Sequence, residues 1–259
     1  MDIAAKRILI TGGTSGLGLA MARALVGVGC QVAITGRYLE SVVQVAKSLG
    51  EGAIGVAMDV RDEVSITAGL EVVNSEFGSI DMLVNNAGLG MVSVNPKFMS
   101  NPEPFYRVSK DGFEGVFDTK VLGTFLVSKA VVPQMINGGG GRVVIISMNT
   151  QTMERKGFIP YGPSGAAVEA MGRVMAADLD GSGVTVNLLL PGGATATSMI
   201  PPDVPDSIRG QLLDPEVMSD PIVFLASYEA SDLHDQRIVA TSFEEWLTTF
   251  RKSRDHQNL

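Results

Sequence analysis

Seven short apolar runs alternate with segments of helical spacing along the whole chain. The runs are rich in Val and Ile and lie at residues 7–11, 31–35, 53–58, 81–85, 142–147, 184–190 and 237–240. Continuous apolar runs of this length are typical of strands that are buried on both faces, as in parallel sheets covered by helices. The pattern therefore predicts an α/β fold: one doubly wound parallel sheet of about seven strands, flanked by helices, over residues 1–250. Residues 251–259 are expected to form a polar C-terminal tail.

Composition and charge exclude several classes of function. The chain is 45% hydrophobic and 19% charged, as folded proteins are, and its net charge of −8 argues against a nucleic-acid partner. One cysteine and two histidines leave no material for a disulfide or a clustered metal site. No apolar run approaches the ~18 residues that span a membrane, so we expect a cytoplasmic protein without a membrane segment or a metal.

Two long segments interrupt the alternation of strands and helices. Residues 89–112 and 191–215 are rich in proline and show little periodicity, and each follows a predicted strand. Ligands of open α/β sheets bind beyond the carboxyl ends of strands, so we expect these segments to form the walls of a substrate pocket. The alternative interpretation is a pair of surface loops.

The stretch TGGTSGLG at residues 11–18 lies between the first predicted strand and the first predicted helix. Glycines there permit a tight turn and a close approach of backbone to a pyrophosphate, which the amide groups at the helix start would bind. A glycine turn without a ligand is the alternative. The residues expected to contact a dinucleotide here are Gly12, Thr14, Ser15, Gly16, Leu17 and Gly18.

With these motifs in this order, the chain resembles the short-chain dehydrogenase/reductase family over nearly its whole length. The resemblance is carried by TGGTSGLG, Asp59-Val60, NNAG at 85–88, Ser147, Tyr161 fourteen residues later, and PGGATATSM at 191–199. It implies a Rossmann-type fold, a nicotinamide cofactor, hydride transfer between an alcohol and a carbonyl, and a homotetramer or homodimer. It also implies further cofactor contacts from Asp59, Val60, Asn86, Ala87, Gly88, Pro191, Gly192 and Thr195.

The end of the second predicted strand favours NADP over NAD. A carboxylate at this place would bind the ribose 2′-hydroxyl and repel a 2′-phosphate, but the sequence has Gly36 followed by Arg37. A guanidinium pairs well with a phosphate. NAD remains possible, because Arg37 is also compatible with a solvated position at a helix start.

The resemblance assigns catalysis to Ser147, which would polarise the substrate oxygen, and to Tyr161, which would transfer a proton. The YxxxK motif of the family reads YGPSG here, so its lysine position is Gly165, and Lys120 stands where the family has an asparagine three residues before Gly123. A free phenol titrates near ~10, so Tyr161 needs a nearby cation at neutral pH. We hypothesise that Lys120 enters the space left at Gly165 and supplies that charge. The alternative is a solvated lysine beside a degenerate site.

The sequence therefore predicts an NADP-dependent oxidoreductase that interconverts a small or medium apolar carbonyl and its alcohol through an atypical active site. Two alternatives stay open. One is a nucleotide-binding sensor or partner protein that performs no hydride transfer, and the other is a lyase or dehydratase that uses Tyr161 and Lys120. The cations in ERK at 154–156 are expected to be solvated, because charge runs in loops usually are.

Overall fold

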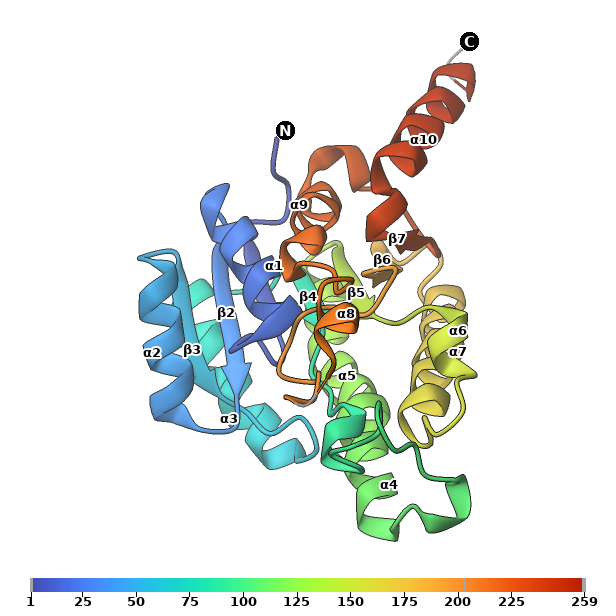
Figure 1. Cartoon of the computed structure of the whole chain (residues 1–259). Coiled ribbons are helices and arrows are strands. Elements are labelled where there is room, and N and C mark those ends of the chain that lie inside the picture. The colour runs from blue at the N-terminus through green and yellow to red at the C-terminus, as the bar shows by residue number, and fades with distance from the viewer. Residues whose placement is uncertain (1, 203, 258–259) are drawn as a thin grey trace.

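The computed structural model describes residues 2–202 and 204–257 and contains one parallel sheet between two layers of helices (Figure 1). The strands lie in the order β3-β2-β1-β4-β5-β6-β7. This arrangement confirms the predicted single-domain, doubly wound, Rossmann-type α/β fold, and each of the seven apolar runs overlaps one strand. The strands are β1 (Arg7–Ile10), β2 (Gln31–Gly36), β3 (Ala53–Ala57), β4 (Met82–Asn85), β5 (Gly141–Ile146), β6 (Val184–Leu190) and β7 (Arg237–Val239).

Successive residues of the central strands enter opposite layers of the core because side chains alternate across a sheet. Ile8 and Ile10 of β1 pack into one layer, whereas Leu9 packs into the other. All three are fully buried. This two-sided burial explains why the strands read as continuous apolar runs and not as alternating patterns.

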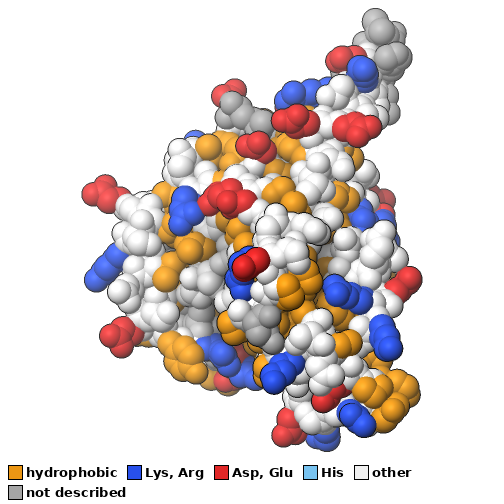
Figure 2. Space-filling model, viewed as in Figure 1, with side chains coloured by type: hydrophobic (Ala, Val, Ile, Leu, Met, Phe, Trp, Pro, Cys, Tyr) orange, Lys and Arg blue, Asp and Glu red, His pale blue; other side chains and the backbone are white. Residues whose placement is uncertain are grey.

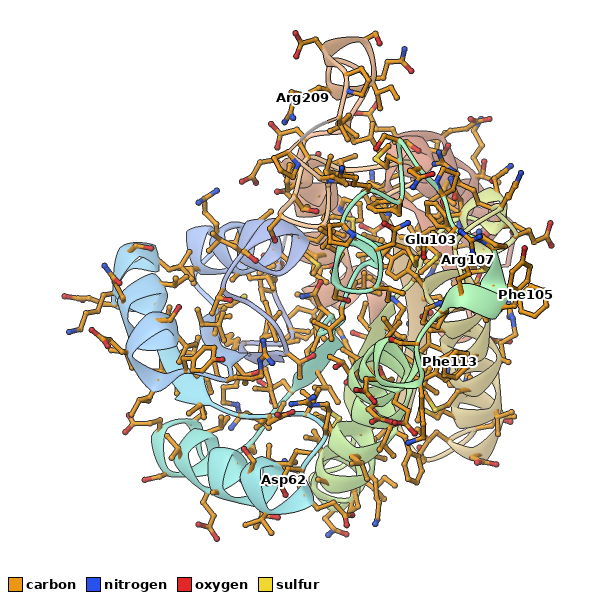
Figure 3. The ribbon with its side chains drawn as sticks, turned by 60° about the horizontal axis from the view of Figure 1, so that its bottom comes forward. Asp62, Glu103, Phe105, Arg107, Phe113 and Arg209 are labelled. Carbon is orange, nitrogen blue, oxygen red and sulfur yellow. The ribbon has the colours of Figure 1, made fainter. Side chains whose placement is uncertain are left out.

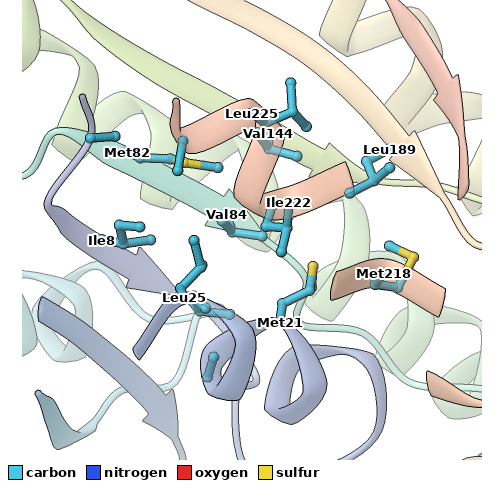
Figure 4. Close-up of a cluster of buried hydrophobic side chains, with 14 of the residues drawn as sticks. Ile8, Met21, Leu25, Met82, Val84, Val144, Leu189, Met218, Ile222 and Leu225 are labelled. Atoms are coloured by element: carbon cyan, nitrogen blue, oxygen red, sulfur yellow. The ribbon is translucent and has the colours of Figure 1, made fainter. Parts of the chain in front are cut away.

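The helices divide between the two faces of the sheet. One face is covered by α1 (Gly16–Gly27), α2 (Leu39–Leu49), α9 (Ser219–Ala226) and the start of α10 (Phe243–Gln257), and Figure 4 shows the side chains packed there. The other face is covered by α3 (Glu63–Phe77), α5 (Gly123–Asn137) and α7 (Tyr161–Asp178). Three short helices lie in the connections, namely α4 (Lys110–Phe117), α6 (Thr150–Met153) and α8 (Asp206–Arg209). Within the described residues, no helix is both long and apolar enough to cross a membrane.

The C-terminal segment differs from the predicted polar tail. Helix α10 continues past residue 250 to Gln257 and projects from the body of the molecule (Figure 1). The rings of Trp246 and Phe250 stack 5.3 Å apart near its base, and Arg251 forms an ion pair with Glu229. Position 250 is therefore not a structural boundary; residues 258–259 lie outside the described residues.

The strand order determines where a ligand can enter. Because β1 lies between β2 and β4, the chain leaves β1 toward one side of the sheet and leaves β4 toward the other. The connections diverge beyond the carboxyl ends of these two strands, and a crevice forms at such a point.

Candidate active site

A cavity of about 510 Å³ lies beyond the carboxyl ends of the strands, a volume typical of ligand sites. Both proline-rich segments contribute to its wall, through residues 89–93, 98–99, 191, 193–195 and 197–200. Figure 2 shows hydrophobic side chains beside Lys and Arg on the face around α8. The predicted cofactor residues that line the cavity are Gly12, Thr14, Ser15, Gly16, Leu17, Arg37, Asp59, Val60, Asn86, Ala87, Gly88, Pro191 and Thr195. Gly18 and Gly192 are not part of this lining.

The glycine turn has a backbone that other residues cannot easily adopt. Gly12 has φ of +65° and Gly16 has φ of +54°, in the left-handed region that favours glycine. Gly18 lies behind the cavity, where a Cβ atom would come within 2.4 Å of the Gly12 carbonyl oxygen. Ser15 precedes α1 and makes no capping hydrogen bond through its side chain. The first amide groups of α1 and the Ser15 hydroxyl thus form a cradle suited to a phosphate.

Asn86 connects the glycine turn to the end of β4. Its side-chain nitrogen donates to the carbonyl oxygens of Thr11 and Gly12, at 3.0 and 2.9 Å. The backbone amides of Asn86 and Ala87 both donate to the Thr11 hydroxyl, at 3.0 Å each. These bonds fix the floor of the cavity at the switch point of the sheet.

Two arginines border the end of the cavity that is formed by β2 and β3. Arg37 and Arg61 both line it, together with Asp59. The Asp59 carboxylate accepts hydrogen bonds from Nε and Nη2 of Arg61, at 2.9 and 2.6 Å, and these bonds lower the pKa of Asp59. Asp59 is therefore already paired, and the net charge of this end is positive.

Lys120 lies beside Tyr161 inside the cavity. It belongs to a turn of π-helix, Asp118–Leu122 (η3), between α4 and α5, a local geometry that often occurs at functional sites. Its side chain is buried, with 8% exposure for the residue, and its Nζ lies 5.7 Å from the centre of the Tyr161 ring. The Nζ also donates to the carbonyl oxygen of Ile146, at 3.4 Å. The lysine is thus not a solvated surface residue.

Burial perturbs both groups of this pair. It lowers the pKa of Lys120 from 10.5 to about 8, although the charge of Glu169 acts in the opposite direction. It raises the pKa of the Tyr161 phenol. Near neutral pH the lysine remains mostly protonated and the phenol is neutral, so a positive charge stands beside the tyrosine ring.

The space beside Gly165 is filled by Met148 and not by Lys120. A Cβ atom at position 165 would come within 2.8 Å of both Sδ and Cε of Met148. The hypothesis that Lys120 enters a void left by Gly165 is wrong in this respect. The proximity of Lys120 to Tyr161 arises from the position of η3 next to α7 instead.

The Ser147 hydroxyl is hydrogen-bonded to a carboxylate in this structure. Ser147 lines the cavity, but its Oγ donates to Oε1 of Glu169 at 2.7 Å. The same carboxylate accepts from Nε of Arg237 at 2.9 Å, and Arg237 also donates to the carbonyl oxygen of Met148 at 3.1 Å. The one hydroxyl proton of Ser147 is thus directed to Glu169, and it would have to leave this acceptor to polarise a substrate oxygen.

An aromatic and methionine-rich wall faces Tyr161. Phe158 makes an edge-to-face contact with Phe98, with ring centres 5.4 Å apart, and lies 6.4 Å from the Tyr161 ring. Met91 is buried against both phenylalanines. The cavity lining thus contains an apolar cluster close to Tyr161, together with polar side chains such as Ser147, Asn149 and Thr152.

Four functional candidates were missed from the sequence: Arg61, Met148, Glu169 and Arg237. Arg61 had a usable signal, since it lies two residues after Asp59. Glu169 also had one, because it is an acidic residue eight positions after Tyr161 and thus near its face of the helix. Met148 and Arg237 had none, as their roles depend on contacts between distant segments.

Comparisons with known proteins agree with this fold. A family model described as short chain dehydrogenase matches residues 6–206. The 3-oxoacyl-(acyl-carrier-protein) reductase FabG of Vibrio harveyi is 31% identical over 245 residues, which cover 89% of this chain and 93% of that protein. D-threitol dehydrogenase of Mycolicibacterium smegmatis is 33% identical, over 72% of this chain and 69% of that protein. The crystal structure of the Brucella melitensis 3-ketoacyl-(acyl-carrier-protein) reductase complexed with NADH superposes with a TM-score of 0.79 and 26% identity, covering 90% of this chain and 95% of that one.

Proposed function

Because this chain belongs to the short-chain dehydrogenase family of oxidoreductases, we propose that it interconverts a carbonyl compound and an alcohol by hydride transfer, with NADP as its nucleotide. The observation that supports this most directly is the burial of Lys120 beside Tyr161 in the cavity that also contains the glycine turn. A proton donor with an adjacent cation and a phosphate cradle are the two components that such a reaction requires from the protein.

The residues of the chain fit a dinucleotide. The amides at the start of α1 and the Ser15 hydroxyl would bind the phosphates, and Asn86 holds the turn that carries those amides. The residues Val60, Ala87, Gly88, Pro191 and Thr195 would contact the rest of the nucleotide from the cavity wall. A bound nicotinamide nucleotide would supply or accept the hydride.

Arg37 and Arg61 support the choice of NADP. Both line the same end of the cavity, and the one acid there, Asp59, is bound by Arg61. Two guanidinium groups facing one paired carboxylate favour an additional phosphate over a ribose hydroxyl. NAD would leave Arg37 without an anionic ligand.

In this proposal Lys120 takes the role of the lysine that the family has at the position of Gly165. Its ammonium would favour the phenolate form of Tyr161, and it is held in place by the Ile146 carbonyl oxygen. Tyr161 would donate the proton to the carbonyl oxygen during reduction and accept it during oxidation. Ser147 would contribute indirectly, by anchoring Glu169 close to the lysine.

The test compares wild type with Tyr161→Phe and Lys120→Met for NADPH oxidation with a panel of ketones, and for NADPH binding by nucleotide fluorescence. Both variants should bind the nucleotide and lose turnover by about a hundredfold or more, the range of general acid catalysis. Lys129→Met is a matched control, since Lys129 is exposed on α5 and paired with Glu63. Unchanged turnover in Lys120→Met would remove the lysine from the mechanism.

The second candidate is a nucleotide-binding protein that performs no hydride transfer. It is favoured by the engagement of the Ser147 hydroxyl with Glu169 and by the packing of Met148 against Gly165. Tight NADPH binding together with no oxidation of NADPH by any ketone of the panel would favour this candidate over the first.

We also propose that the protein assembles as a homodimer or homotetramer in the cytoplasm. Phe113 on α4 and Phe125 on α5 are 40% and 45% exposed, and Figure 3 shows Phe113 and Phe105 along one side of the molecule. Exposed aromatic residues of this kind are typical of interfaces. Light scattering should give the mass of an oligomer, and Phe125→Asp should lower it; a wild-type monomer would contradict the proposal.

A further inference from the structure

We propose that the substrate carries an anionic group at the end of an apolar chain, and that Arg155 binds this group. The inference rests on the proposed carbonyl–alcohol chemistry and specifies the chemical class of its substrate. It concerns Arg155 of the ERK segment, which is exposed to solvent as the sequence predicted and also borders the rim of the cavity.

The charges that line the cavity have the opposite sign to the protein as a whole. The chain has a net charge of −8, yet among the described residues the charged members of the lining are four cations and one acid, namely Arg37, Asp59, Arg61, Lys120 and Arg155. The acid is paired with Arg61. A positively charged cavity in an acidic protein attracts anionic ligands through its local electrostatic potential and favours their binding over that of neutral ligands.

Three of the four cations already have an assigned partner. Arg37 and Arg61 lie at the nucleotide end, and Lys120 is buried beside Tyr161. Arg155 lies at the other end, in the loop between α6 and α7. Across the described ranges 2–202 and 204–257, Arg155 forms no ion pair, although the acids Glu103 and Glu154 are in neighbouring segments.

The Arg155 guanidinium is held against the apolar wall. Its Cζ lies 4.7 Å from the centre of the Phe158 ring, a cation–π contact, and the same ring lies 6.4 Å from the Tyr161 ring. The Phe158 ring thus contacts both the Arg155 guanidinium and the Tyr161 ring. A cation so placed can bind the end of a ligand whose other end reaches the tyrosine.

The surface between these two points suits a flexible hydrocarbon chain. Phe98, Phe158 and Met91 form a buried cluster there, and Met99 packs against it. Methionine side chains adapt to ligands of variable shape. The geometry therefore favours a keto or hydroxy compound with its reacting carbon at Tyr161, an alkyl segment along Phe158 and Phe98, and a carboxylate or phosphate at Arg155.

A pair of ketones that differ only in the anionic group tests this inference. We expect wild type to show a higher kcat/KM for 7-oxooctanoate than for 2-octanone. Arg155→Gln should lower kcat/KM for 7-oxooctanoate about tenfold, mainly through KM. The value for 2-octanone should stay unchanged, because only the anionic ketone forms a charge-assisted hydrogen bond with Arg155. Arg155→Lys should retain part of the preference. Lys156→Gln is the matched control, since Lys156 is an exposed neighbour outside the cavity lining.

A binding measurement separates failure of this inference from failure of the proposed function. Calorimetric titration with octanoate, in the presence of NADP, requires no turnover. If neither ketone is reduced, weaker octanoate binding by Arg155→Gln still supports the anion site, whereas equal binding overturns it. If both ketones are reduced with equal kcat/KM, or the variant affects both alike, the anion site is overturned while the carbonyl chemistry stands.

Discussion

Replacing Lys120 with methionine should stabilise the protein at neutral pH while removing its activity. Burial lowers the pKa of this lysine from 10.5 to about 8. The charged form is therefore less stable in the folded protein than in the unfolded chain. Each pKa unit corresponds to about 1.4 kcal/mol, so the shift of about 2.5 units costs about 3 to 4 kcal/mol. The hydrogen bond to the Ile146 carbonyl oxygen, at 3.4 Å, offsets about 1 kcal/mol at most. Methionine of similar length should therefore raise the free energy of unfolding by about 2 to 3 kcal/mol at pH 7.

The pH dependence of this gain follows from proton linkage. Below pH 8 the lysine is protonated in both the folded and the unfolded chain, so the full cost is present. Between pH 8 and 10.5 the unfolded chain holds a proton that the folded protein has released, and the contribution of Lys120 to stability therefore rises with pH. The advantage of Lys120→Met should shrink across this window and nearly vanish at its upper end.

Urea denaturation, monitored by the fluorescence of Trp246, the one tryptophan of the chain, measures the difference in unfolding free energy between wild type and Lys120→Met at each pH. Protein concentration must be equal throughout, because assembly changes apparent stability. Lys129→Met should change stability little at any pH, since exposed ion pairs contribute little. A loss of stability in Lys120→Met at pH 7, or a gain that is the same at pH 7 and at about pH 10, would refute the reasoning that the buried ammonium is desolvated.

Three further perturbations probe the surroundings of the pair. Arg37→Glu should weaken NADPH binding at least tenfold more than NADH binding, by repulsion of the extra phosphate; equal effects in fluorescence titrations would exclude Arg37 from the 2′-phosphate site. Glu169→Gln removes the charge that raises the pKa of the buried lysine, so the transition in the pH profile of kcat/KM should move to lower pH, whereas Glu229→Gln, at a half-buried acid outside the cavity lining, should leave it in place. Gly165→Lys should destabilise the protein by about 1 to 3 kcal/mol, since its Cβ would lie within 2.8 Å of Met148, and a second change, Met148→Ala, should recover the loss in thermal unfolding.

Much of the candidate site was predictable because the signals are local. The doubly wound parallel sheet could be inferred from the alternating pattern, and the glycine turn follows from residues that need positive φ at Gly12 and Gly16. The departures in two motifs led to the hypothesis that Lys120 is the cation for Tyr161, and the structure places its Nζ 5.7 Å from the centre of the Tyr161 ring. The prediction that its side chain occupies a space beside Gly165 was incorrect, because Met148 fills that space and its packing has no signature in the sequence.

The sequence by itself determined the sheet, the cradle at the start of α1 and the selection of Lys120 as a polar neighbour of Tyr161. Those features depend on periodicity, backbone freedom and residue type, which are properties of short segments. Only the tertiary structure decided which atoms meet: Ser147 with Glu169, Met148 with Gly165, and Arg155 with the aromatic wall. These contacts join α7, the end of β5 and the loop before α7, and side-chain partners across such boundaries depend on how the elements pack, because dense interiors admit few alternative arrangements.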